Sequence, residues 1–505
     1  MSEKTKPEFS KVRSIIFPVY AFELKKVLPM GMIFFFILFN YTCLRNIKDT
    51  LVVTAAGAEV IPFLKFFCVT PAAFIFMALY VQGSNIFNRQ NLFYVTIIPF
   101  IIFFGLFGFF IYPNKELLHP SAEYIAHLKT VWPHGLHRLL DIFQTWSYST
   151  FYILAEIWGS AILSLLFWQF ANQITKVPEA KRFYAFFGFM AQLALLLAGE
   201  LGEHFSRVSS NLPAGADPWQ HSLYWLMGTV VVFGFGTVAL YKWMHMAVLT
   251  DKRFYDESES VGSSKKKKPK LGFLESFQVI FTSPYLMMIA FLVIAYGTTI
   301  NFVEGVWKSQ LKLEYPSYNE YNTFMSKFTF YTGIATMIML VVGGNILRKF
   351  RWTTAAIITP VTMLIAGSCF FGFILYRDEL TPWISQMGTN PIAMAVLFGA
   401  AVVIMTKSTK YALFDLTKEM AYIPLDDEMK VKGKAVVDVV GGRLGKSTGA
   451  GIQTGLFILV STITATSASF FQIAPYVAGL FLVFSFLWIV CVKCLGKRVE
   501  AISNK

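Results

Sequence analysis

The sequence predicts an all-α membrane protein with twelve transmembrane helices. Of its 505 residues, 55% are hydrophobic and 17% are aromatic, whereas only 15% are charged. A soluble domain carries about 25% charged residues. Long apolar runs recur along the chain, and several reach the roughly 20 residues that a helix needs to cross the hydrocarbon core of a bilayer. The composition therefore places most of this chain in lipid.

Twelve segments are apolar enough to be spans, and their ends are defined to within several residues. They cover residues 27–48, 59–82, 92–112, 143–172, 183–203, 222–245, 284–306, 321–347, 353–376, 390–417, 434–463 and 472–495. The even number of spans puts both ends of the chain on the same side of the membrane.

The formal net charge of +14 is explained first by topology. Basic residues gather in the N-terminal segment, in the loops after even-numbered spans and in the C-terminal tail. Lys and Arg in short loops face the cytoplasm, so we expect both termini to be cytoplasmic. The basic excess then needs no nucleic-acid partner, and the expected partner of the surface is the lipid bilayer.

A charged linker divides the chain into two halves. It contains Asp-Glu-Ser-Glu-Ser followed by a run of lysines, and it cannot bury a core. Spans 4 and 10 both lead through a short charged loop with a proline into the next span. This fits parallel 6+6 repeats, the layout of major-facilitator transporters, with the substrate between the halves near the midplane. The predicted parts are a cytoplasmic segment 1–26, a six-helix bundle 27–249, the linker 250–272, a second six-helix bundle 273–495 and a cytoplasmic tail 496–505.

Charged residues inside the first nine spans are candidates for the transport site. Ionisable groups at such depth are costly and commonly face a cavity where they function. Lys65 lies early in span 2, where snorkelling to the nearby interface is the alternative. Glu156 lies in span 4, where a structural pair with a lysine is the alternative. Asn301, Glu304 and Lys308 share one face of span 7, which favours a polar stripe along a cavity.

The stretch from Lys407 to Gly451 adds the sharpest candidates. The segment Gly441-Gly-Arg-Leu-Gly-Lys-Ser447 resembles a phosphate-binding loop, but its glycine spacing is one residue short and no strand precedes it. Gly441, Gly445 and Gly449 recur every four residues, a pattern typical of close helix packing. Arg443 and Lys446 project from another face. We expect these two cations to hold phosphate groups, Arg443 bidentately and Lys446 as a point charge.

Cations outnumber acids within the predicted spans. Such an excess is unstable unless a mobile anion often neutralises it, which predicts a multiply charged anionic substrate. The glutamates would pair with the lysines in the empty state and release them on binding. Five further residues are secondary candidates for binding or gating: Arg45, Lys48, Lys407, Lys410 and Asp415.

No metal or cofactor is expected. The five cysteines lie in or beside apolar segments, and the single C-x-x-C at Cys491 and Cys494 lacks the second pair or the histidines that a zinc site needs. Four histidines gather between spans 3 and 4 without acidic or cysteine partners at metal-ligand spacing. We expect an ordinary solvated loop there.

Eight motifs together resemble the ATP/ADP translocases of obligate intracellular bacteria and plastids, over residues 25 to 495. They are Lys48-Asp-Thr-Leu-Val-Val-Thr-Ala, Pro62-Phe-Leu-Lys65, Ala155-Glu-Ile-Trp-Gly-Ser, Leu166-Phe-Trp-Gln-Phe-Ala-Asn-Gln-Ile-Thr, Val303-Glu-Gly-Val-Trp-Lys-Ser, Lys410-Tyr-Ala-Leu-Phe-Asp, Lys418-Glu-Met-Ala-Tyr-Ile-Pro-Leu-Asp and Arg443-Leu-Gly-Lys-Ser.

The resemblance implies a twelve-span, major-facilitator-like fold and the exchange of external ATP for internal ADP by alternating access. The family's functional charges are two lysines and two glutamates. They fall here on Lys65, Glu156, Glu304 and Lys446. ATP and ADP are the implied substrates, with phosphate as a further one, and a single copy is expected to function. Asn301 is expected to orient the nucleotide, and Tyr41 or Tyr411 to stack on the adenine.

Several alternatives remain open at this point. A proton-coupled importer of several nucleotides or of NAD would use Glu156 or Glu304 as the proton carrier. A membrane-embedded transferase would need an acid/base cluster at a membrane surface, and the sequence has no such pattern. Residues 1–26 resemble neither a cleavable signal peptide nor a transit peptide. We therefore expect the inner membrane of an intracellular bacterium rather than a plastid envelope.

Overall fold

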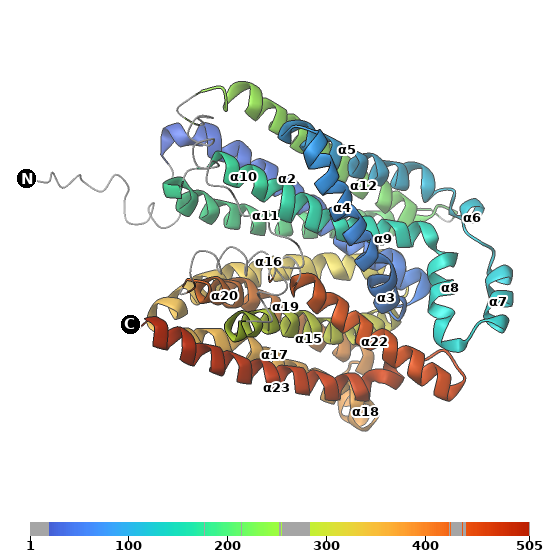
Figure 1. The fold of residues 1–505 in the computed structure, drawn as a ribbon. Helices are drawn as coiled ribbons and strands as arrows, with labels where there is room; N and C mark the ends of the chain where they lie inside the picture. The colour runs from blue at the N-terminus through green and yellow to red at the C-terminus, as the bar shows by residue number, and fades with distance from the viewer. Residues whose placement is uncertain are drawn as a thin grey trace, which may run out of the picture.

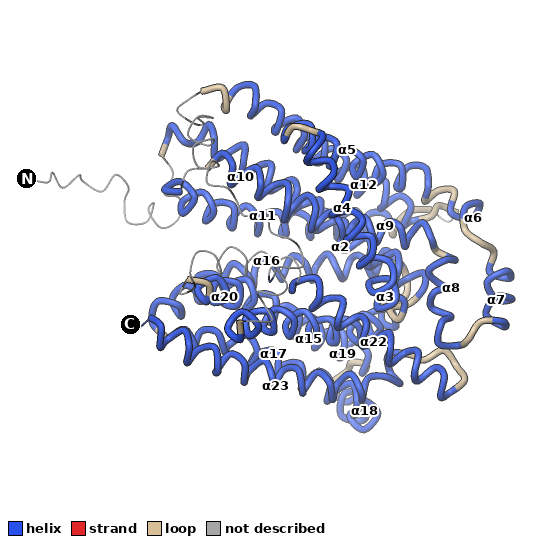
Figure 2. The backbone as a smooth tube through the Cα atoms, viewed as in Figure 1, coloured by secondary structure: helices blue, strands red, loops and turns tan. Residues whose placement is uncertain are grey.

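The structure, a computed structural model, describes residues 20–175, 177–213, 215–251, 254, 283–423, 425, 437 and 441–503. Within these ranges the chain is helical, with loops and turns and no strand (Figure 2). Most of the expected linker 250–272, and residues 426–436 of the expected charged loop, lie outside the described residues.

The first six expected spans are found as long helices, several of them continuous through π-helical segments. They are α2 (Leu24–Ala56); α3, η2 and α4 (Val60–Phe63, Leu64–Val69, Thr70–Ile86); α5 and η3 (Arg89–Leu106, Phe107–Ile111); α9, η5 and α10 (Trp146–Trp158, Gly159–Phe167, Trp168–Ile174); α11 (Val177–Ser209); and α12 (Pro218–Ala247). Most extend beyond the predicted ends, because amphipathic turns continue each helix past its apolar window.

The last six spans are α15 (Pro284–Glu314), α16 (Tyr318–Lys349), α17 (Trp352–Leu375), α19 with η6 and α20 (Pro391–Thr409, Lys410–Phe414, Asp415–Ala421), α22 (Gly442–Thr464) and α23 (Phe470–Ser503). Eleven helices of the described residues are long and apolar enough to cross a membrane. Helix α22 is not among them, because glycines, hydroxyl side chains and two cations fill its first turns.

The helices lie in two groups, α2 to α12 and α15 to α23 (Figure 1). Helix α2 starts and α23 ends at the same end of the bundle, and we call the opposite end the distal end. The groups meet there along α11 and α16. A Cβ at Gly199 would lie 2.8 Å from the Phe330 side chain, and Gly333 lies against Leu195. The domain boundaries given above stay a prediction.

The segment between spans 3 and 4 is not the solvated loop that we expected. It forms α6 (Lys115–Leu118), α7 (Ala122–Val131), η4 (His134–Leu136) and α8 (His137–Gln144), which lie across the distal end (Figure 1). We call residues 115–144 the distal strap. Buried apolar residues such as Ile125 and Leu140 anchor it. Sequence patterning missed it because its helices are too short to show a clear period.

Helix starts follow from capping residues in the loops. Asp217 accepts hydrogen bonds from the backbone N–H groups of Trp219 and Gln220, at 3.0 and 3.1 Å. The same role at other helices falls to Asn88, Ser121, Ser283, Ser317 and Asn390. Each side-chain oxygen satisfies a donor that the first helical turn leaves free. Helix α2 ends at Gly57, whose φ of 86° suits glycine.

Candidate functional site

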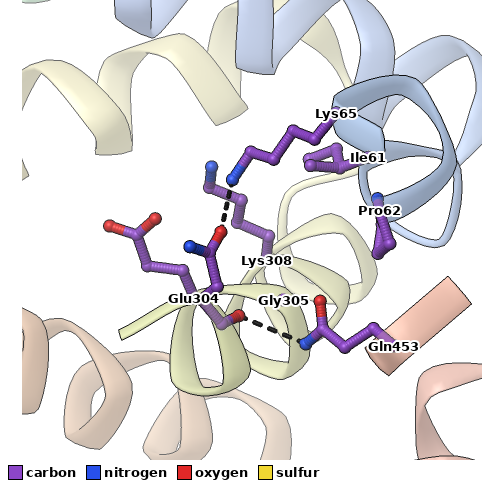
Figure 3. A pocket seen from close by; sticks show the side chains of 8 residues that line it. Ile61, Pro62, Lys65, Glu304, Gly305, Lys308 and Gln453 are labelled. Carbon is purple, nitrogen blue, oxygen red and sulfur yellow. Dashed lines mark hydrogen bonds between the residues drawn. The ribbon is translucent and has the colours of Figure 1, made fainter. Parts of the chain in front are cut away.

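A small pocket lies between the two groups of helices, formed by α3 and η2 on one side and α15 and α22 on the other. Its lining is Ile61, Pro62, Lys65, Asn301, Glu304, Gly305, Lys308 and Gln453 (Figure 3). The shared face of Asn301, Glu304 and Lys308 is thereby confirmed, because all three line it. The Lys65 ammonium donates a hydrogen bond to Asn301 Oδ1 at 2.7 Å. Lys65 therefore joins the two groups of helices.

A chain of ion pairs runs from α22 through α9 and α2 to α15. Lys446 Nζ lies 3.9 Å from Glu156 Oε2, and Lys48 Nζ lies 3.1 Å from Glu156 Oε1. Lys48 also lies 2.9 Å from Asp49 Oδ1, while Lys308 Nζ lies 2.8 Å from Asp49 Oδ2. Charges alternate in sign along this chain, so each carboxylate is shared by two ammonium groups. Because these residues come from both groups of helices, movement of one group relative to the other changes the distances within the ion pairs.

Two further ion pairs lie within the second group. Glu304 Oε1 accepts the Lys407 ammonium at 2.7 Å, which joins α15 to α19. Lys410 pairs with Asp415 at 2.7 Å within the π-helical turn of the same span. Lys407, Lys410 and Asp415 therefore have partners beside them, and Lys410 also lies 4.6 Å from the centre of the Tyr411 ring.

The glycine stripe of α22 packs against α15 as predicted. A Cβ at Gly445 would lie 3.0 Å from Ile294 Cα, and one at Gly449 would lie 3.2 Å from Thr298 Cα. With this face against α15, Arg443 is half-buried and the Lys446 side chain is 59% exposed. Within the chain of ion pairs, Lys446 is therefore the cation that solvent can reach, whereas Lys48 and Lys308 are enclosed.

Arg45 lies half-buried on α2, within electrostatic reach of Glu304 and Tyr41. Tyr41 is half-buried against Gly159, and Tyr411 is exposed. Asn301 has both ends of its amide engaged, since its Nδ2 donates to Gly297 O at 2.7 Å. In this conformation it holds Lys65 rather than presenting a free amide to a ligand.

The structure brings together the four charges that carry the sequence resemblance, but it adds partners that we did not single out. Asp49 and Tyr152 both contact Lys48, and the Lys48 ammonium lies 3.8 Å from the centre of the Tyr152 ring. Gln453 donates to the backbone oxygen of Asn301 at 3.2 Å. The sequence did offer a signal for Asp49, because it is a carboxylate next to Lys48 within an apolar span. Among the described residues, no group of three or more His, Cys, Asp or Glu is arranged to hold a metal ion.

Comparison with known proteins identifies the family. A family model described as TLC ATP/ADP transporter matches residues 2–499. The chain belongs to this family. The resemblance noted from the sequence motifs is therefore confirmed, and so is the expectation of a transporter rather than an enzyme. The alternative of a membrane-embedded transferase falls with it.

Relatives within the TLC ATP/ADP transporter family match over the full length. The chain is 48% identical to ADP,ATP carrier protein 1 of Chlamydia pneumoniae, over 98% of this chain and 96% of the relative. It is 42% identical to ADP,ATP carrier protein 1 of Rickettsia prowazekii, over 100% and 99%. The chloroplastic ADP,ATP carrier protein 1 of Arabidopsis thaliana is 44% identical over 97% of this chain and 76% of the relative.

Solved structures confirm the fold. A bacterial homologue of the iron transporter ferroportin, in an inward-facing state, gives a TM-score of 0.60 at 11% identity and covers 95% of this chain and 100% of its own. A D-xylose-proton symporter gives 0.55 at 14% identity, over 92% and 97%. At these identities the likeness shows the fold alone. The predicted major-facilitator-like architecture of this multi-pass membrane protein is thereby confirmed.

Proposed function

We propose that this protein exchanges ATP for ADP across a membrane by alternating access. The observation that carries the proposal is the excess of positive charge at the site where the two groups of helices meet. Among the described residues of this site, seven cations face three carboxylates, an excess of four positive charges: Arg45, Lys48, Lys65, Lys308, Lys407, Arg443 and Lys446 against Asp49, Glu156 and Glu304. Phosphate groups carry several negative charges and strong acceptor oxygens, which suits this excess. The names of the relatives support ATP and ADP as the substrates.

Lys446 and Arg443 are the first phosphate ligands in the proposed site. Both lie on the accessible face of α22, and Lys446 has Glu156 as a weak partner at 3.9 Å. A phosphate oxygen at hydrogen-bond distance would outcompete that contact, because charge-assisted bonds are shorter and stronger. Glu156 then keeps Lys48. Glu304 holds Lys407 in the same way, so both glutamates act as substitutes for the anion in the empty carrier.

Exchange rather than net transport follows from the same imbalance. Without nucleotide, four positive charges would have to pass through a closed, water-poor intermediate, and burying unpaired charge is expensive. A bound nucleotide neutralises them and lowers this barrier. The empty carrier therefore reorients slowly, which ties the entry of one nucleotide to the exit of another.

The proposal extends to location and assembly. We infer an inner membrane of an intracellular bacterium, with both termini cytoplasmic, so that the distal end faces outward. The two groups of one chain enclose the pocket, so one copy is sufficient for transport. Inorganic phosphate, which shares the acceptor chemistry, is proposed as a weaker substrate.

Uptake into proteoliposomes tests the function. Vesicles containing the purified protein are loaded with ADP, with another nucleotide or with nothing, and labelled ATP is added outside. We expect uptake only with internal ADP or ATP, and no effect of a proton ionophore. Equal uptake into empty vesicles, abolished by the ionophore, would instead establish a proton-coupled importer. Lys446→Ala should lose most of the exchange, while Lys349→Ala, an exposed lysine at the end of α16, should keep it.

A further inference from the structure

Helix α2 divides its hydrogen bonds between the two groups of helices. In its first part, the Asn40 amide donates to Val230 O at 2.9 Å, within the first group. In its last part, the Asn46 amide donates to Thr329 Oγ1 at 3.0 Å, across to α16 of the second group. The distal portion of α2 is thus bonded to the other group, and these contacts must break before the distal end can open.

Asp49 and Lys308 carry formal charge at this same interface. Asp49 lies seven residues before the end of α2 at Ala56, and Lys308 lies six residues before the end of α15 at Glu314. At 1.5 Å per residue, both lie about 10 Å from the distal ends of their helices. Only 3% of Asp49 and 5% of Lys308 is exposed. The pair therefore lies at one depth in both groups, at the edge of the pocket that Lys308 lines.

A buried ion pair of this kind is weak as a source of stability. Removing two charges from water costs several kcal/mol per ion, and their attraction only repays that cost in good geometry. When the distal end opens, water can reach both charges and the pair can separate. The free energies of the paired and the hydrated states are therefore close, which is the property of an element with two states.

We propose that Asp49 and Lys308 form a latch that keeps the distal end closed and withholds Lys308 from the nucleotide while it is closed. The inference rests on the proposed exchange of nucleotides, which it deepens. On opening, Asp49 keeps Lys48, its neighbour on the same helix, at 2.9 Å. Lys308 moves away with α15, and its ammonium then faces the pocket without a carboxylate partner, opposite Lys65 of the first group.

The consequence is a different set of phosphate ligands on each side. With the distal end closed, the Lys446 side chain is 59% exposed and the Lys308 side chain 6%. With the distal end open, Lys308 and Lys65 receive the phosphates. As the distal end closes, Asp49 replaces the nucleotide's phosphate as the partner of Lys308. Closure and the release of the phosphate from Lys308 therefore occur together.

Distances across the distal end test the latch directly. Nitroxide labels at Glu116→Cys on α6 and Gln386→Cys on α18, both exposed, report the opening in a background without native cysteines. We expect Asp49→Asn and Lys308→Met each to raise the open-to-closed ratio about tenfold, within the range of couplings between global states. The double variant should raise the open-to-closed ratio no further than the more strongly affected single variant does, because either substitution alone already breaks the ion pair.

Asp217→Asn is the matched control. Asp217 pairs with Lys115 at 2.7 Å, also near the distal end, but both residues belong to the first group. Asparagine keeps the helix cap, so the distance distribution should equal that of the parent. Parental distributions in both single variants, or additive shifts in the double variant, would overturn the latch. If Asp49→Asn does not fold, Lys308→Met alone decides, and a parental distribution in it overturns the proposal.

Transport kinetics give a second readout that a general structural defect would not produce. Lys308→Met should raise the KM for nucleotide supplied at the distal side, since it removes a phosphate ligand. Asp49→Asn should lower that KM and slow the maximal exchange rate, because Lys308 is never withheld. Changes of KM in the same direction in both variants would contradict the proposal. If the parent protein exchanges no nucleotide, the proposed function fails, while the label distances still test the latch.

Discussion

Lys48 shows how single residues balance charge in this protein. Its ammonium lies 2.9 Å from Asp49 Oδ1, 3.1 Å from Glu156 Oε1 and 3.8 Å from the centre of the Tyr152 ring. Two carboxylates and an aromatic face together compensate for the loss of water around a residue that is 2% exposed. Glu156 is the member of this set that also reaches Lys446, so it links the enclosed charges to the accessible one.

Replacement of Glu156 tests this link at the scale of one residue. Glu156→Gln should lower the exchange rate about tenfold or more, matching the 1.5–3 kcal/mol that a hydrogen bond to a charged group typically contributes. The neutral amide cannot offset Lys48 and Lys446 together. Glu156→Asp keeps the charge at a shorter reach and should be intermediate. Initial rates of labelled ATP uptake at equal protein content measure both, and parental exchange by Glu156→Gln would refute the role.

Helix α22 shows how one element separates packing from function. Its glycine face permits backbone contact with α15, and the opposite face presents Arg443 and Lys446 to the space between the groups. The π-helical segments have a related effect. Segment η2 contains Lys65, η5 begins just after Glu156, and η6 begins at Lys410. The extra residue in each π-helical turn changes the direction in which the neighbouring side chains point.

Two glycines of α22 give a matched comparison at the scale of the element. Gly445→Ala places a Cβ 3.0 Å from Ile294 Cα, so we expect a loss of about 1–3 kcal/mol, the usual cost of overpacking. At Gly455, on the same helix, a new Cβ would meet no side chain and no backbone of another helix within 4 Å, so Gly455→Ala should be neutral or stabilising. Thermal unfolding in detergent compares the two. Equal melting temperatures would mean that the close approach to α15 contributes no stability.

The whole molecule is closed at its distal end by the strap as well as by helix contacts. His137 Nδ1 hydrogen-bonds with Ser467 Oγ at 3.1 Å, and Arg138 Nη2 donates to Ala468 O at 3.1 Å. Asp141 accepts bonds from both Arg138 and Lys129 and keeps the strap in place. The strap is part of the first group, between its third and fourth spans, and it contacts the turn between α22 and α23 of the second group, so alternating access requires this contact to part.

A reversible cross-link tests whether that contact parts during transport. In a cysteine-free background, His137→Cys and Ser467→Cys are joined with a short methanethiosulfonate linker. We expect nucleotide exchange to fall to background on linking and to recover on reduction, because the distal end can no longer open. Each single variant, treated in the same way, should keep its exchange. Undiminished exchange by the fully linked protein would show that the strap does not move relative to α22.

Much of this architecture follows from local pattern alone. Each of the twelve predicted spans is found as a helix, because apolar length and loop caps are properties of neighbouring residues. The stripe of Gly441, Gly445 and Gly449 and the shared face of Asn301 and Glu304 are likewise consequences of helical periodicity. The distal strap escaped prediction because its short helices are held by contacts with the other half.

The amino-acid sequence by itself determined the membrane class, the helices and the presence of isolated charges at depth. Only the tertiary structure decided which charges meet. Lys65 finds Asn301 across 236 residues, and Lys308 finds Asp49 across 259. Helical periodicity assigns a residue to a face of its own helix, but it carries no information about which face of a distant helix lies opposite. That choice is made when the two groups of helices pack together.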